Sequence, residues 1–146
     1  MIVYGIGYNE INLSAEFRAG RYNPVTDSWT TISSTEAPAL PGGYIAVWTG
    51  TEIIILPAEV MNGSIFGFRY NLVTNTWATI SSTNSPTLVG KLSAVWTGNE
   101  MIVLGKTNIQ YKTRGSRYNP VTNTWAEISS RSLPNFRPYG ELLMSP

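Results

Sequence analysis

Short apolar runs separated by polar turns divide the chain into candidate strands. The clearest run is 53–56, which is continuous and mostly β-branched, as expected for a strand buried on both faces. Before it, the apolar stretch 46–48 ends at Thr49 and Gly50, which signals a hairpin. Residues 29–32 read Trp-Thr-Thr-Ile and form another candidate strand, and no window holds apolar residues at helical spacing for more than a turn. The pattern therefore predicts an all-β chain of short strands.

The same pattern returns at a constant step along the chain. A six-residue segment, Arg-Tyr-Asn-Pro-Val-Thr at its first occurrence, is found at 21–26, 69–74 and 117–122, so the period is 48 in the numbering. Aligning 21–52 with 69–100 gives 20 identities in 32 positions. A fixed period near 50 indicates a repeat architecture. We therefore divide the single domain 1–146 into a first unit at 1–35, a second at 44–83 and a third at 92–131.

The end of the chain matches the part that the first unit lacks. The second and third units begin with an Ala-Val-Trp-Thr-Gly stretch, whereas residue 1 already lies in the apolar run that follows such a stretch. The segment one repeat period after 94–98 is 142–146, at the C-terminus, so this segment is equivalent to the Ala-Val-Trp-Thr-Gly stretch. We expect the segment 140–144 to supply the opening strand of the first unit, either in its own chain or in a partner chain.

Each unit predicts four strands. A lone four-stranded sheet leaves two apolar faces that other layers must cover. Stacking such sheets radially buries these faces and leaves only short edges, which is the arrangement of a β-propeller. Units of about 50 residues with four strands each fit this architecture.

Two segments resemble the kelch repeat in the form common in bacterial proteins. One is Ala-Val-Trp-Thr-Gly-x-Glu followed by apolar residues, and the other is Arg-Tyr-Asn-Pro-x-Thr-x-x-Trp. The Tyr and Trp seven positions apart, such as Tyr22 and Trp29, are a fairly specific part of the resemblance, which covers the whole chain. The family usually carries a Gly-Gly pair after the second strand. At the equivalent positions this chain has Gly5-Ile6, Pro57-Ala58 and Gly105-Lys106 instead. We therefore expect the following loops to take their own paths.

The resemblance implies a half propeller of three four-stranded blades. Kelch propellers usually have six or seven blades, and three cannot close a ring. Two chains give 3 + 3 = 6, so we expect a head-to-tail homodimer that forms one six-bladed ring. The alternative is that the sequence is an excised half of a longer protein.

Composition narrows the chemistry. The net charge is +1, which gives no strong attraction to nucleic acid or to membranes, and no stretch is apolar for long enough to span a membrane. There is no Cys and no His, so thiol chemistry and imidazole ligands or bases are excluded, as is the copper oxidase activity of some kelch-like propellers. Asp27 is interpreted as a turn residue, and the spacing of the eight Glu selects no catalytic pair. We expect no enzyme activity, metal or cofactor. The sequence does not determine the cellular compartment, although its Thr, Ser and Asn content slightly favours an extracytoplasmic location.

Residues that recur with the unit are expected to pack between units. These are the tyrosines Tyr22, Tyr70 and Tyr118, the tryptophans Trp29, Trp77 and Trp125, and the arginines Arg21, Arg69 and Arg117. The arginines are expected to form hydrogen bonds between units. Glu52 and Glu100 occupy matched positions beside the hairpin and are expected to be structural.

Binding is expected where the units differ, on the loops that open at one face of the propeller. In each unit one such loop connects the second and third strands, at 7–17, 59–65 and 106–113. The candidate ligand-binding residues are Tyr8, Asn9, Glu10, Glu59, Asn62, Asn108, Tyr111, Arg114, Arg137 and Tyr139. They suit a protein or peptide ligand. The alternatives are a carbohydrate ligand, a self-assembling structural unit without ligand, and ordinary solvated loops.

Overall fold

The structure is a computed structural model, and it describes residues 2–8, 15–33, 35, 37, 43–108, 112–129 and 131. For 2–8, 15–19 and 62 it describes the backbone alone. Within these residues the chain forms strands and turns and no helix. The strands are β1 (Ile2–Tyr8), β2 (Ala15–Asn23), β3 (Ser28–Thr31), β4 (Tyr44–Trp48), β5 (Glu52–Pro57), β6 (Glu59–Ser64), β7 (Phe68–Asn71), β8 (Thr76–Thr79), β9 (Thr87–Trp96), β10 (Met101–Lys106), β11 (Thr113–Asn119) and β12 (Thr124–Glu127). The all-β prediction is confirmed.

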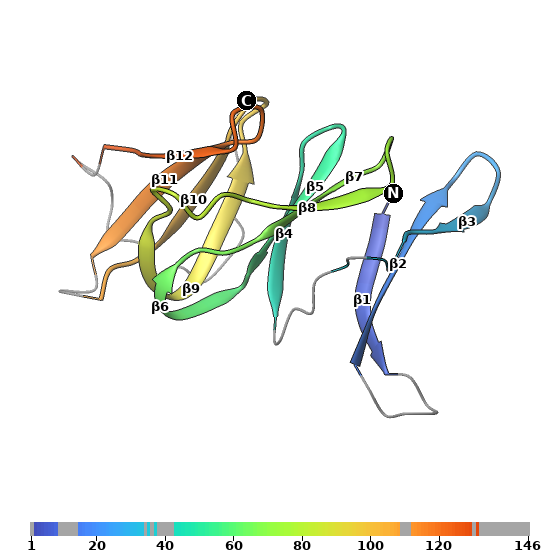
Figure 1. The fold of residues 1–146 in the computed structure, drawn as a ribbon, viewed down its shortest axis with the longest axis horizontal. Coiled ribbons are helices and arrows are strands. Elements are labelled where there is room, and N and C mark those ends of the chain that lie inside the picture. The colour runs from blue at the N-terminus through green and yellow to red at the C-terminus, as the bar shows by residue number, and fades with distance from the viewer. Residues whose placement is uncertain are drawn as a thin grey trace.

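The strands form three antiparallel sheets, none of which closes on itself. Their strand orders are β1-β2-β3, β4-β5-β7-β8 and β12-β11-β10-β9-β6. Figure 1 shows the sheets side by side, with the β4-β5-β7-β8 sheet between the other two. The three sheets therefore follow the order of the units along the chain.

The hairpins have the turn chemistry that the sequence predicts. Between β4 and β5, Gly50 has a φ of 100°, and Gly98 at the equivalent turn has 106°. The hydroxyl of Thr49 accepts a hydrogen bond from the Glu52 N–H at 2.9 Å and closes the turn. In the turn after β2, the side-chain oxygen of Asn23 accepts from the Val25 N–H at 3.0 Å.

The core is organised around β5, which is buried on both faces as predicted. Ile54 and Leu56 are fully buried in one cluster, which also contains side chains of β9 and β10. Ile53 and Ile55 point into a second cluster, which contains Ile32 from the end of the first unit. Because successive side chains of a strand alternate between its faces, β5 connects both clusters.

Two predicted loops differ from the structure. Residues 59–64, expected within a loop, form β6, which pairs with β9 of the third unit. β9 begins at Thr87, well before the apolar stretch that predicted it in the sequence. The edge of this extension has backbone N–H and C=O groups that form hydrogen bonds with β6, and the pairing also buries Val60. The hairpin of β1 and β2 also continues further than expected, because Gly7 pairs with Glu16 and Tyr8 with Ala15. The expected strand at 140–144 lies outside the described residues.

Candidate functional site

The structure places only some of the predicted binding residues. Glu59 is exposed on β6, Asn108 is exposed after β10, and Arg114 lies on β11. For Tyr8, at the end of β1, and Asn62, in β6, only the backbone is described. The others lie outside the described residues: Asn9, Glu10, Tyr111, Arg137 and Tyr139.

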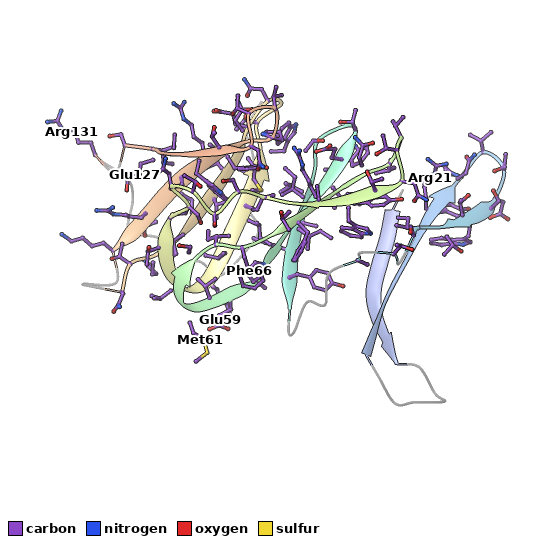
Figure 2. The ribbon with its side chains drawn as sticks, viewed as in Figure 1. Arg21, Glu59, Met61, Phe66, Glu127 and Arg131 are labelled. Atoms are coloured by element: carbon purple, nitrogen blue, oxygen red, sulfur yellow. The ribbon has the colours of Figure 1, made fainter. Side chains whose placement is uncertain are left out.

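Arg114 lines a pocket of about 530 Å³ on the third unit. The pocket lies between the segment that enters β9 and the pair β11 and β12, and its lining is Asn84, Ser85, Pro86, Thr87, Thr107, Arg114, Ser116, Trp125, Ala126 and Glu127. Two connections meet there, one between the second and third units and one between β10 and β11. Glu59 is not among the lining residues. In Figure 2 it lies near Met61 at the lower edge of the molecule, away from Glu127 at the upper left.

The pocket has both polar and apolar lining residues and carries one ion pair. Arg114 Nη1 lies 3.1 Å from Glu127 Oε1. Both side chains are largely exposed, so the pair contributes at most about 1 kcal/mol to stability and can be reorganised by a ligand. Asn84 and Thr107 add an amide and a hydroxyl. Glu127 is the one carboxylate among the lining residues, whereas glycoside hydrolysis uses two. Among the described residues no group of three or more Asp and Glu could hold a metal ion.

The polar residues of the pocket do not recur at the repeat period. One repeat period before Asn84, Thr107, Arg114 and Glu127, the sequence has Glu36, Glu59, Phe66 and Thr79. Within the part of the chain that the structure describes, this pocket is therefore an asymmetric surface, made by polar side chains that the other units lack.

A second set of polar contacts joins consecutive units, and it follows the repeat. At the first junction, between the first and second units, the Ser33 N–H donates to Asn75 Oδ1 at 3.4 Å. The Ser33 carbonyl accepts from Trp77 Nε1 at 3.0 Å. The same two bonds occur at the second junction, at 2.8 and 2.7 Å, among Ser81, Asn123 and Trp125. At both junctions, the backbone N–H and C=O of a serine in one unit thus bond to the asparagine and tryptophan side chains of the next unit.

The recurring asparagine also accepts from the recurring tyrosine of its own unit. The Tyr118 hydroxyl donates to Asn123 Oδ1 at 2.7 Å, and Tyr70 donates to Asn75 in the same way. Burial raises the pKa of both tyrosine hydroxyls, while the guanidinium of the preceding unit acts in the opposite direction, Arg21 on Tyr70 and Arg69 on Tyr118. Each of these arginines therefore lies close to the next unit.

Arg69 confirms that a recurring arginine forms a hydrogen bond between units. Its Nη1 donates to the Pro120 carbonyl, in the turn of the third unit, at 2.6 Å. The same guanidinium lies 3.8 Å from the Glu52 carboxylate, and Arg117 lies 3.7 Å from Glu100 in the matching pair. The structural role expected of the two glutamates is thus confirmed.

The prediction that all six recurring aromatic residues pack in the core is wrong for the first unit, where Trp29 is exposed and Tyr22 is only partly buried and belongs to neither core cluster. Trp77 and Trp125 are 8% and 4% exposed, but Trp29 is 58% exposed. Its ring still lies against Tyr22, with centroids 5.1 Å apart, as in the 4.9 and 5.0 Å pairs of the other units. The difference arises because each pair packs toward the preceding unit, and no described sheet covers that face of the first unit.

Asp27 stands where the other units have asparagine. It has a φ of 48°, close to the 57° of Asn75 and the 54° of Asn123, which confirms it as a turn residue. The Tyr22 hydroxyl donates to Asp27 Oδ1 at 2.8 Å, and this bond, followed by burial, raises the pKa of Tyr22. Since the asparagines use their side chains at the junctions only as acceptors, a carboxylate can take the same role.

Removing the acceptor at Asn123 is expected to destabilise the chain by about 2 kcal/mol, because it leaves two donors without an acceptor at a packed junction. Asn123→Gly tests this, since glycine accepts the positive φ. Asn123→Ala should cost about 1 kcal/mol more than Asn123→Gly, because alanine is strained at the positive φ of this position. Asn123→Asp should change stability by less than about 1 kcal/mol, as Asp27 implies. Urea unfolding curves give the three values. A loss for Asn123→Asp as large as that for Asn123→Gly would contradict the interpretation.

Sequence reasoning missed the serine at the junctions and the acceptor role of the asparagine. A signal was present, since Ser-Ser recurs at 33–34, 81–82 and 129–130. The serine bonds through its backbone, however, and a backbone contact cannot be predicted from the type of the residue. The pocket residues Asn84 and Thr107 were missed because each is an ordinary loop residue until the two loops meet.

Comparison with known proteins adds no relative: no protein-family model matches the chain, and no curated protein matches it. Within the described residues, no helix is long and apolar enough to cross a membrane. The functional argument therefore depends on the sequence repeat and on the geometry above.

Proposed function

We propose that the chain is a kelch-type half propeller and that two copies close a six-bladed ring. The support is the constant repeat period, the resemblance of the repeated motifs, and the order of three antiparallel sheets along the chain. In this proposal each sheet is a blade, and the segment 140–144 completes the first one. The two outer faces of the three-sheet array would then meet those of a second copy.

The ring acts as a non-catalytic binding module for a protein or peptide. The observation that carries this proposal is the asymmetric pocket of Arg114, Glu127 and Asn84, made by residues that the repeat does not share. A small sugar bound by every blade would favour repeated pockets, and Trp125, the aromatic residue in the lining, is buried with its indole N–H already bonded to Ser81. Exposed amide, hydroxyl and guanidinium groups suit the backbone and acidic side chains of a peptide.

The first measurement is the mass of the protein in solution by light scattering on a sizing column. We expect twice the single-chain mass of 16.1 kDa at micromolar concentration. A mass near 16.1 kDa at all concentrations would contradict the ring.

The second measurement tests the pocket with a phage-displayed library of random peptides and a glycan array. We expect peptides to be selected, with Arg114→Ala weakening their binding at least about tenfold, because a charge-assisted hydrogen bond contributes about 1.5–3 kcal/mol. Arg131→Ala is the matched control, since Arg131 is exposed on the third unit but does not line the pocket. Selection of glycans alone would favour the carbohydrate alternative, and equal effects of the two variants would place the binding surface elsewhere.

A further inference from the structure

The two outer faces of the chain carry the two halves of one junction. The face of the first unit presents Asp27 and Trp29, and the Trp29 side chain is 58% exposed. These two residues are equivalent to Asn75 and Trp77, which act as acceptor and donor at the first junction inside the chain. The third unit presents Ser129, the exposed counterpart of Ser33 and Ser81. Because both junctions within the chain join these groups in the same way, the outer faces are complementary to one another.

We propose that Trp29 and Asp27 of one copy bind the backbone of Ser129 of a second copy. This inference rests on the proposed two-chain ring and supplies its interface. In the ring, the third unit of one copy is followed by the first unit of the other. Moving the second-junction contacts on by one unit therefore replaces Asn123 with Asp27 and Trp125 with Trp29. The Ser129 N–H donates to the Asp27 carboxylate, and the Ser129 carbonyl accepts from Trp29 Nε1.

The same shift assigns a partner to Arg117. Arg69 reaches the Pro120 carbonyl of the next unit, and the equivalent carbonyl for Arg117 is that of Pro24 in the second copy. The Arg117 side chain is 51% exposed, against 25% for Arg69, which already has its partner. Arg69 also lies close enough to Tyr118 to act on its pKa. By analogy the Arg117 guanidinium lies near the Tyr22 hydroxyl of the second copy, which is itself hydrogen-bonded to the Asp27 carboxylate, so opposite charges attract one another across the junction.

Apolar side chains behind these polar groups are also left uncovered. Ile54 and Leu56 of β5 are fully buried against the third unit, but their counterparts on β10, Ile102 and Leu104, are only partly buried. Ile128 is likewise partly buried, whereas Ile80 is 5% exposed. The outer face of the third unit thus has the apolar residues that an adjoining sheet covers elsewhere in the molecule. A second copy is the occupant whose own outer face matches both the apolar and the polar pattern.

The test is the dissociation constant of the dimer, measured by sedimentation equilibrium for single-residue variants. Trp29→Phe keeps a ring but removes the N–H, and we expect the constant to rise about 25-fold, since each hydrogen bond contributes about fivefold and the closed ring has two identical junctions. Asp27→Ala should weaken the dimer at least as much. Asp27→Asn, which restores the residue of the internal junctions, should stay within about threefold of the parent.

Trp77→Phe is the matched control, because it deletes the same N–H at a junction inside the chain. It should lower folding stability and leave the dissociation constant unchanged. A two-chain dimer whose constant is unaffected by both Trp29→Phe and Asp27→Ala would overturn the inference while leaving the two-chain ring intact. A chain that stays monomeric at about 100 µM, where a dissociation constant of about 1 µM would leave little monomer, would overturn both.

Cysteine pairing gives a second readout, because a disulfide traps the associated chains even where the loss of the Asp27 carboxylate weakens the dimer. The chain has no Cys, so single cysteines can be placed without background. Mixing an Asp27→Cys chain with a Ser129→Cys chain under mild oxidation should give the crosslinked heterodimer as the main covalent product. The double variant Asn123→Cys with Ser81→Cys calibrates the geometry, because it should close within one chain. Closure of the internal pair without any crosslinked heterodimer would overturn the inference.

Discussion

Ile54→Ala is expected to lower the free energy of unfolding by about 4 kcal/mol, measured by urea unfolding at submicromolar concentration. Ile54 is fully buried in the centre of β5, where it packs in the cluster shared with the third unit. Removing three carbon atoms there leaves a cavity that the neighbours cannot fill, because β5 is held on its other face by a second cluster.

The repeat supplies a control of the same residue type. Ile102 occupies the equivalent position on β10, but it is only partly buried. Ile102→Ala should therefore cost less, about 1–2 kcal/mol in the dilute chain, because part of the side chain already contacts water and less apolar surface is lost from the core. In the assembled ring its cost should rise toward that of Ile54→Ala. Equal losses for the two variants in the dilute chain would show that the outer face of β10 is already covered.

Much of the strand arrangement could be predicted from the sequence, because local chemistry determines it. The glycine of each Thr-Gly turn sets the hairpin, the side chain of Asn23 closes the next turn, and four adjoining apolar residues mark β5. These signals need no knowledge of distant residues. Trp77 and Trp125 were predicted as core residues for a similar reason, since recurrence at the repeat period implies contact between units.

The remaining features depend on which surfaces meet, and sequence periodicity does not settle that. β6 forms because the long edge of β9 lies beside it, and the segment 59–64 carries no strong strand signal of its own. The exposure of Trp29 depends on whether another sheet lies next to the first unit, although its sequence context matches that of Trp77. At the candidate site, Arg114 was predicted, but Asn84 and Thr107 become partners only when two loops from different units converge.

Gly67→Ala is expected to destabilise the chain by about 3 kcal/mol or more, because the position has no room for a β-carbon. An added Cβ would lie 2.6 Å from the Ile55 carbonyl oxygen, 2.6 Å from Leu56 Cδ2 and 2.8 Å from Ile80 Cδ1. The Ile55 oxygen belongs to the backbone of β5, so relief requires that the strand itself shift. The two side chains are sealed in the core between the second and third units and have little freedom to turn away.

Gly115 is the matched position in the third unit, and there the outcome should differ. The three atoms nearest to its added Cβ all belong to side chains: Ile128 Cδ1 at 2.5 Å, Leu104 Cδ2 at 2.6 Å and Ile128 Cγ1 at 2.8 Å. Both side chains are only partly buried and can turn toward the uncovered face. Gly115→Ala should therefore cost about 1 kcal/mol in thermal or urea unfolding of the dilute chain. It should also weaken the proposed dimer, because the displaced side chains occupy the face that we propose the second copy covers. A loss for Gly115→Ala equal to that for Gly67→Ala at low concentration would mean that this face is packed within the single chain, and the argument for a second copy on it would fail.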